Sequence, residues 1–388
     1  MKFIFVILFI TLVYAFLNYY IGRRTLTFIR GLNLKINAVV FWVVFALISM
    51  SYIIAKFTER LLPDFLSEAI NLIGGYWLAV MLYFILIILV VDTLRLINRR
   101  VNFGRYLGVN SKNSGSVIGI VVFIALIALL AYGTYNGRHA VVREYDITIP
   151  KKANNISELN IVMVSDIHIG TIIHNGRLIN MVDKINSLMP DIVLLAGDIV
   201  DGNMDSFINE NMSKTFGKIK APLGVYAVPG NHDYISEHTN DLIKELKKAG
   251  VKTLVDDKVK IADSFYIIGR NDLSSERDTK KKRMTAEELL KNVDKNSTLI
   301  MMDHQPYHLE EAERAGIDIQ FSGHTHKGQL FPSDLITKRI YELDWGYLKK
   351  GKLNTFVSSG FGTWGPPIRI GSKAEIVNVK VHFNKRNN

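Results

Sequence analysis

Five polar clusters in the second half of the chain combine histidine with carboxylate or amide side chains. In chain order they are Ser165-Asp166-Ile167-His168, Gly197-Asp198-Ile199-Val200-Asp201, Pro229-Gly230-Asn231-His232-Asp233, Asp303-His304-Gln305-Pro306 and Gly323-His324-Thr325-His326. One such cluster alone is weak evidence for a functional site, since it also occurs by chance in ordinary turns. Taken together, mixed imidazole and carboxylate ligands favour Zn, Fe or Mn over Mg or Ca. They also suffice for two metal ions with open coordination positions.

Each cluster follows a short apolar run that reads as a buried strand. The predicted strands cover 159–164, 191–196, 223–228, 264–268, 298–302, 317–321 and 375–381. Predicted helices cover 176–189, 204–219, 239–249, 285–292 and 307–315. This alternation predicts a layered α/β domain. Because sites in α/β sheets gather at the carboxyl ends of strands, the five loops are expected to converge.

The motifs D-x-H, G-D-x-x-D, G-N-H-D, H and G-H-x-H, in this order over 158–383, resemble the calcineurin-like metallophosphoesterase superfamily. All five match, and the resemblance implies a four-layer α-β-β-α sandwich. The segment 323–369 further resembles the membrane-associated bacterial phosphohydrolase branch typified by YkuE and YaeI. Lys327 stands where glycine is common in that branch.

The resemblance also implies two divalent metal ions, with Mn, Fe or Zn expected. It assigns Asp166, His168 and His326 to the first ion and Asn231, His304 and His324 to the second, with Asp198 bridging them. Two such ions are expected to hold a bridging hydroxide that attacks phosphorus.

His232 is the expected proton donor to the leaving group, with Asp233 orienting its imidazole. A structural turn histidine is the alternative. Asp201 is expected to support the site rather than to bind metal. Arg369 either contacts the substrate phosphate or pairs with a neighbouring carboxylate. The basic run 280–283 is expected to be solvated, with anionic lipid as the alternative contact.

Composition separates the chain into two parts. Of its 388 residues 48% are hydrophobic and none is cysteine, which excludes disulfides, thiolate metal sites and a cysteine nucleophile. Residues 1–140 carry 13 Lys+Arg against 4 Asp+Glu, whereas 141–388 carry 34 against 32. The nearly balanced charge of the globular part argues against a nucleic-acid partner.

Four apolar runs are long enough to cross a bilayer: 3–21, 36–56, 72–91 and 117–135. The first lacks a small-x-small cleavage site, so a retained helix is favoured over a signal peptide. No ionisable residue occupies the centre of a run, which favours anchoring over transport. The expected division is a membrane region at 1–136, a linker with a first strand at 137–157, and the catalytic domain at 158–388.

The charges of the connecting loops predict an orientation. The first loop carries Arg23, Arg24, Arg30 and Lys35, the second Glu59, Asp64 and Glu68 against Arg60, and the third Arg95, Arg99, Arg100, Arg105 and Lys112 against Asp92. The positive-inside rule therefore places the catalytic domain outside the cytoplasm, which Arg138, Arg143, Lys151 and Lys152 mildly oppose.

Together these patterns predict a membrane-anchored phosphohydrolase that acts on a phosphodiester, phosphomonoester or pyrophosphate, with lipid-linked substrates included because the enzyme is tethered. Membrane lipids are expected partners, and no protein partner is implied. The alternatives are a nuclease or cyclic-nucleotide phosphodiesterase, and a membrane sensor whose metal domain only binds.

Overall fold

The chain forms two compact units. The computed structural model describes residues 2–384 apart from 59–60, 102–113, 152, 154–155, 171, 203 and 237. The helical unit comprises Met1–Thr134 and Gly365–Ile368, and the α/β unit comprises Tyr135–Trp364 and Arg369–Asn388. Among the charges used to predict the orientation, Glu59, Arg60, Arg105, Lys112 and Lys152 lie outside the described residues.

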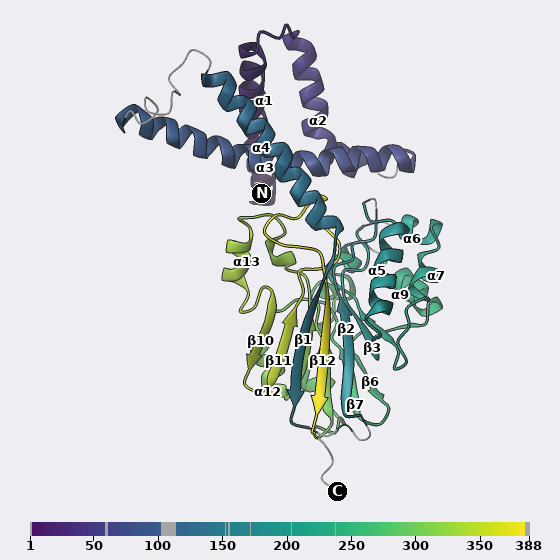
Figure 1. Cartoon of the computed structure of the whole chain (residues 1–388). Helices are drawn as coiled ribbons and strands as arrows, with labels where there is room; N and C mark the ends of the chain where they lie inside the picture. The colour runs from purple at the N-terminus through teal and green to yellow at the C-terminus, as the bar shows by residue number, and fades with distance from the viewer. Residues whose placement is uncertain are drawn as a thin grey trace. The chain divides into compact units, whose positions relative to one another are not determined.

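Four long helices make up the helical unit (Figure 1): α1 (Lys2–Gly31), α2 (Ala38–Thr58), α3 (Asp64–Val101) and α4 (Ser114–Arg138). By length and composition, each is able to cross a membrane. α1 and α3 continue beyond the predicted spans into their basic ends. Arg24 of α1, expected in a loop, pairs instead with Asp92 of α3 at 2.5 Å, so this basic segment remains helical.

The α/β unit contains two six-stranded sheets. The first has the order β1 (Val141–Ile149), β12 (Glu375–Phe383), β2 (Glu158–Val164), β3 (Ile192–Ala196), β4 (Val225–Val228) and β5 (Val251–Thr253). The second has the order β10 (Gly346–Lys350), β11 (Leu353–Val357), β9 (Ile319–Ser322), β8 (Thr298–Met302), β7 (Phe265–Gly269) and β6 (Asp257–Ile261). The strands β2 to β5 are mutually parallel, as are β7, β8, β9 and β11.

The unit has four layers because its central strands are buried on both faces. Val193 and Leu195 of β3 pack against helices, whereas Ile192 and Leu194 pack against the second sheet. This alternation explains why the strands read as continuous apolar runs. The helices α5 (Asn175–Ser187), α6 (Asp205–Asn209), α7 (Met212–Phe216) and α9 (Thr239–Lys248) contribute to the first outer layer, and α11 (Ala286–Leu289) and α12 (Leu309–Ala315) to the second. The predicted α-β-β-α sandwich is confirmed.

Several elements differ from the sequence-based expectation. The helix predicted over 204–219 is two short helices, because Asn211 between them has a left-handed backbone (φ 52°). The edge strands β5, β6 and β10 were not predicted, nor were the inner strand β11 and the helix α13 (Asp334–Ile340). The edge strands β6 and β10 are partly exposed, and their charged and polar residues hide the strand pattern.

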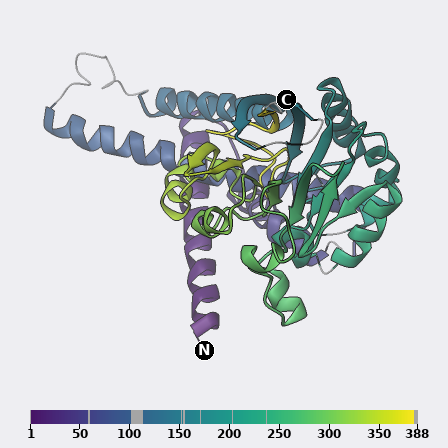
Figure 2. The ribbon, with the colours of Figure 1, turned by 90° about the horizontal axis from the view of Figure 1, so that it is seen from below.

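The arrangement places five loops at one end of the two sheets. In the first sheet these loops follow β2, β3 and β4, and in the second they follow β8 and β9. Figure 2 shows the teal and green helices beside the teal strands of the first sheet. The clusters predicted from the sequence occupy these loops.

Candidate metal centre

The first predicted ligand set comes together although its members lie far apart in the sequence. His168 Nε2 lies 3.0 Å from His326 Nε2. His326 Nε2 lies 3.4 Å from Asp166 Oδ1. The three ligand atoms are all within 4.8 Å of one another, close enough to hold one metal ion.

The second set forms beside the first. His304 Nε2 lies 3.1 Å from Asp198 Oδ2, and His324 Nδ1 lies 2.7 Å from Asn231 Oδ1. Asn231 Oδ1 is also 3.2 Å from His304 Nε2. Asp198 Oδ2 is 3.9 Å from His168 Nε2, so this carboxylate stands between the two sets. That is the place a bridging ligand requires.

Burial controls the protonation of the ligands. It lowers the pKa of His168 to about 4, and burial together with the positive charge of His304 lowers the pKa of His324 to about 4. Burial raises the pKa of Asp166. Burial also opposes both charges of the Asp198–His304 pair, but their mutual attraction outweighs it, lowering the pKa of Asp198 and raising that of His304.

The donor set fits divalent metal ions. Asp166 and Asp198 are buried carboxylates, 0% and 1% exposed, and they face imidazole nitrogens. Neutral imidazoles and carboxylates are the forms that bind Zn, Fe or Mn. Two Nε2 atoms 3.0 Å apart have at most one proton to share, and a cation between such groups relieves the crowding of lone pairs.

Backbone contacts hold the ligands in place. His304 Nδ1 donates to Ala196 O at 2.8 Å, which leaves Nε2 for the centre. The backbone N–H of His324 donates to Asp166 Oδ1 at 2.9 Å, and that of His232 donates to Asp198 Oδ1 at 2.8 Å. Each carboxylate is thereby oriented by a residue from another motif.

Five of the seven ligands have a left-handed backbone: Asp166, His168, Asp198, His324 and His326. Such conformations cost about 1–3 kcal/mol each for residues other than glycine and concentrate at functional sites. Gly230 and Gly323 admit the close approach, since a Cβ on Gly230 would stand 2.2 Å from Asp198 Oδ1 and one on Gly323 would stand 2.3 Å from Asp166 Oδ2. This is why glycine recurs in the motifs.

His232 lies next to the ligands with its ring 4.8 Å from that of His168. Its Nδ1 donates to Asp201 Oδ1 at 2.9 Å. Burial alone would lower the pKa of His232, but the hydrogen bond to Asp201 and the charge of Asp198 outweigh it and raise the pKa. Asp201 is therefore the residue that orients the His232 imidazole.

The structure does not support the orienting role expected for Asp233. Its carboxylate accepts the backbone N–H groups of Ile199, Val200 and Gly230 at 3.0, 2.9 and 2.8 Å. Burial and the charge of Asp198 raise the pKa of Asp233 to about 7. Asp233 therefore links the loop that carries Asp198 to the loop that carries Asn231, because its carboxylate accepts backbone hydrogen bonds from both.

The structure supports neither role expected for Arg369, a contact with substrate phosphate or a pair with a neighbouring carboxylate. Arg369 is 0% exposed, its guanidinium donates to Gly360 O and Gly362 O, and one of its nitrogens lies 3.1 Å from His326 Nδ1. Burial lowers its pKa to about 10. Arg369 holds the His326 ring from behind rather than facing substrate.

Sequence reasoning missed Trp364, whose ring lies 5.8 Å from that of His232 and is 53% exposed. Gln329 fixes its backbone through hydrogen bonds to both Trp364 N and Trp364 O, at 2.9 and 2.8 Å. The motifs carry no aromatic position, so a lone tryptophan far from His232 in the sequence gave no signal. The sequence did carry a signal for Asp201, because this residue is the second Asp of the G-D-x-x-D motif.

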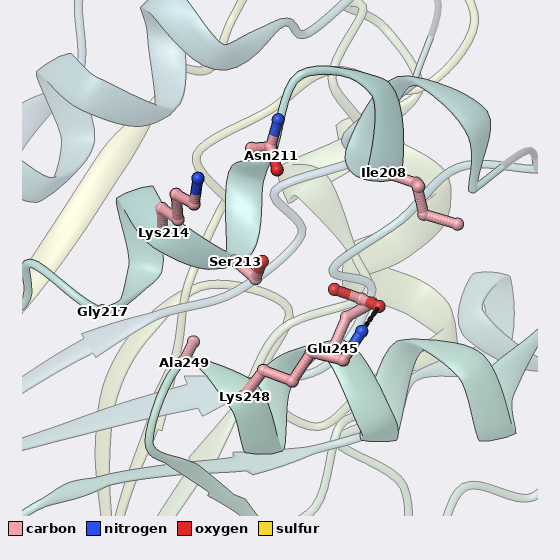
Figure 3. Close-up of a pocket in the computed structure, with 8 residues that line it drawn as sticks. All are labelled: Ile208, Asn211, Ser213, Lys214, Gly217, Glu245, Lys248 and Ala249. Atoms are coloured by element: carbon pink, nitrogen blue, oxygen red, sulfur yellow. Dashed lines mark hydrogen bonds and ion pairs between the residues drawn. The ribbon is translucent and has the colours of Figure 1, made fainter.

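A hollow of about 440 Å³ between α7 and α9 is a separate feature (Figure 3). Its described lining includes Lys214 and the ion pair of Lys248 with Glu245 at 2.5 Å. No predicted site residue is among those lining residues, and the hollow offers none of the ligands described above.

Comparison with known proteins agrees with this geometry. The calcineurin-like phosphoesterase family matches residues 159–328. An uncharacterized metallophosphoesterase of Aquifex aeolicus (strain VF5) is 34% identical over 264 residues, covering 67% of this chain and 98% of that protein. The chain belongs to the calcineurin-like metallophosphoesterase family.

Another relative has a membrane part by name. A transmembrane protein with metallophosphoesterase domain from Danio rerio is 29% identical over 278 residues, covering 69% of this chain. The match spans 63% of the length of that protein. Among solved structures, a 5'-nucleotidase precursor from Thermus thermophilus is similar at a TM-score of 0.35 and 16% identity, covering 57% of this chain and 54% of that one.

The place of Arg369 predicts its effect on metal binding. Arg369→Lys loses the planar group that packs beside His326 and donates to the two glycine carbonyls, so we expect metal affinity to fall about 10–100-fold, as for other residues that orient a ligand. Titration of the full chain with Zn²⁺ or Mn²⁺ measures this, with the exposed Arg314→Lys as the matched control. Unchanged metal affinity together with a raised KM would instead return Arg369 to the substrate site.

Proposed function

We propose that the protein is a membrane-anchored, metal-dependent phosphoester hydrolase with two divalent ions. The observation that carries the proposal is the convergence of seven ligands with Asp198 between two sets, 3.1 Å from His304 and 3.9 Å from His168. Mn, Fe or Zn is the expected metal, because the ligands mix imidazole nitrogen with carboxylate and amide oxygen.

When bound, divalent ions at such a pair of sites neutralise phosphoryl charge and activate water for in-line attack on phosphorus. The protein supplies the remaining groups. Asp201 holds the His232 ring through Nδ1, which leaves Nε2 to carry a proton toward the leaving oxygen. The exposed ring of Trp364 stands beside His232, where the leaving group departs. Asp233 keeps the loops of Asp198 and Asn231 in register.

The substrate class is a phosphodiester, phosphomonoester or pyrophosphate, and lipid-linked forms are favoured. Support comes from the four apolar helices, which would hold the centre among membrane lipids at high local concentration. The balance of 34 basic and 32 acidic residues over 141–388 weighs against nuclease activity. A metal-binding sensor is less favoured because His232 and Asp201 are both in place for proton transfer.

The first test is metal-dependent turnover by the full chain in detergent, with a chromogenic phosphodiester and a monoester and with Mn²⁺, Zn²⁺ or Mg²⁺ supplied separately. We expect Asp198→Ala to reduce turnover by more than about a hundredfold, beyond the loss caused by changing a residue that merely supports a ligand. Asp241→Ala, on the outer helix α9, is the control. A folded, metal-loaded wild type without turnover on any of these esters would refute catalysis.

The role of His232 predicts a dependence on the leaving group. His232→Ala should slow substrates with a poor alkoxide leaving group by about 10²–10⁴-fold, the usual contribution of general acid catalysis. Nitrophenyl esters, whose leaving group needs no proton, should be affected far less. Asp201→Asn should show the same pattern to a smaller extent. Equal losses with both substrate types would show that His232 is structural.

The side of the membrane is a further part of the proposal. The loop charges favour a catalytic part outside the cytoplasm. We expect a reporter fused after Asn388 to be active if it requires export and inactive if it requires the cytoplasm. The reverse pair of results would invert the assigned topology while leaving the chemistry untouched.

A further inference from the structure

An apolar surface on the α/β unit lies beside the metal centre. It consists of Phe331, Leu335, Ile336, Ile340 and Trp364, which are 50–61% exposed and are called here the α13 surface. None of the seven residues of α13 is buried. Other large apolar residues exposed in the described α/β unit, such as Met189 and Ile208, come from separate segments. Contiguous apolar exposure of this kind marks an interaction site.

The α13 surface is tied to the metal ligands through the chain. Gly328, two residues after His326, packs so closely on the start of α13 that a Cβ would stand 2.3 Å from Asp334 N. Gln329 then binds the backbone of Trp364, whose ring meets His232. The surface therefore sits at the end of the sheets where the ligand loops lie.

The first strand of the α/β unit starts at that same end. Val141 of β1 pairs with Glu375, and Val377 pairs with Met163 of β2. Val141 is thus level with the residues that follow β2, where Asp166 begins the first ligand loop. Figure 1 shows α13 and the start of β1 at one end of the unit.

The chain enters this end directly from a helix able to cross a membrane. Gly115–Arg138 meets that criterion with 24 residues, a length of roughly 36 Å against a hydrocarbon core of about 30 Å. Two residues separate Arg138 from β1 and reach at most about 7 Å. Within the α/β unit, Ala374 N donates to Asn136 O and Arg177 donates to Gly137 O, so the residues just before β1 are held by hydrogen bonds.

The chemistry of the surface fits a lipid interface. Its leucine, isoleucine, phenylalanine and tryptophan side chains are those that enter the boundary between headgroups and acyl chains. Lys338 and Arg339 are exposed on α13, against Asp334, which pairs with Lys338 at 2.8 Å. Basic residues beside an apolar face match anionic headgroups.

We propose that the α13 surface docks on the anionic phospholipid bilayer that holds the chain, so that the metal centre faces the lipid headgroups. The basic run 280–283 has no part in this surface. Arg283 is buried and pairs with Asp303 at 2.8 Å, while Lys280, Lys281 and Lys282 are exposed on a different loop. The inference is independent of turnover, since lipid contact requires no catalysis.

The absence of cysteine from the sequence makes a direct test possible. Ile336→Cys in the full chain, labelled with an environment-sensitive fluorophore, is placed in vesicles of phosphatidylglycerol and phosphatidylcholine with or without a spin-labelled lipid that quenches at the headgroup boundary. The control is Met189→Cys, which is apolar and 82% exposed but precedes β3 and so lies at the opposite strand ends.

We expect blue-shifted emission and at least about twofold quenching at position 336, because an interfacial helix buries its apolar face about 5–10 Å into the boundary. Position 189 should show neither. Leu335→Cys provides a second probe in case one label disturbs α13. Equal weak quenching at 335, 336 and 189 would overturn the proposal. Blue-shifted emission at 336 without quenching would also overturn it, by showing that protein covers the surface.

Discussion

Two buried carboxylates that no lysine or arginine is seen to pair with among the described residues, Asp166 and Asp198, are the constraint on which the α/β unit depends. Taking a charge out of water is costly unless it is paired or coordinates a metal. Here the carboxylates face imidazoles, three of which are held neutral by burial. Five of the candidate ligands also have a left-handed backbone. Cations at the centre would stabilise such an arrangement, because they convert crowded lone pairs into bonds. The surrounding fold has to supply the rigidity that keeps the ligands in place.

That rigidity comes from two sheets rather than one. The ligand loops leave both sheets at the same end, and strands such as β3 are buried on both faces, which leaves them little freedom to shift. Contacts between motifs then fix the positions of the ligand loops relative to one another. Asp233 accepts three backbone N–H groups across two loops, and Arg369 supports His326 from the interior. Asp233 and Arg369, which were expected to act in catalysis or on substrate, thus hold the candidate ligands in place.

The sequence predicted which candidate ligands come together better than it predicted the residues that support them. The seven ligands stand in short motifs at strand ends, and strands buried on both faces are continuous apolar runs, so both were readable. Asp201 and Asp233 carry the same functional group within three positions of their motifs' key residues, and spacing could not say which of them meets His232. The buried state of Arg369 depends on distant loops. The strands β6 and β10 were not predicted because they are short and partly exposed, and each carries two lysines in place of a continuous apolar run.

The junction between α4 and β1 connects the two halves of the chain in function. Only two residues separate α4, a helix able to cross a membrane, from β1, the first strand of the α/β unit, so the metal centre is tethered by a short connection. A soluble ester gains nothing from this tether, but a phosphoester carried by a lipid meets the centre at high effective concentration. The short connection and the α13 surface, which includes the exposed Trp364 beside His232, therefore favour the same substrate class.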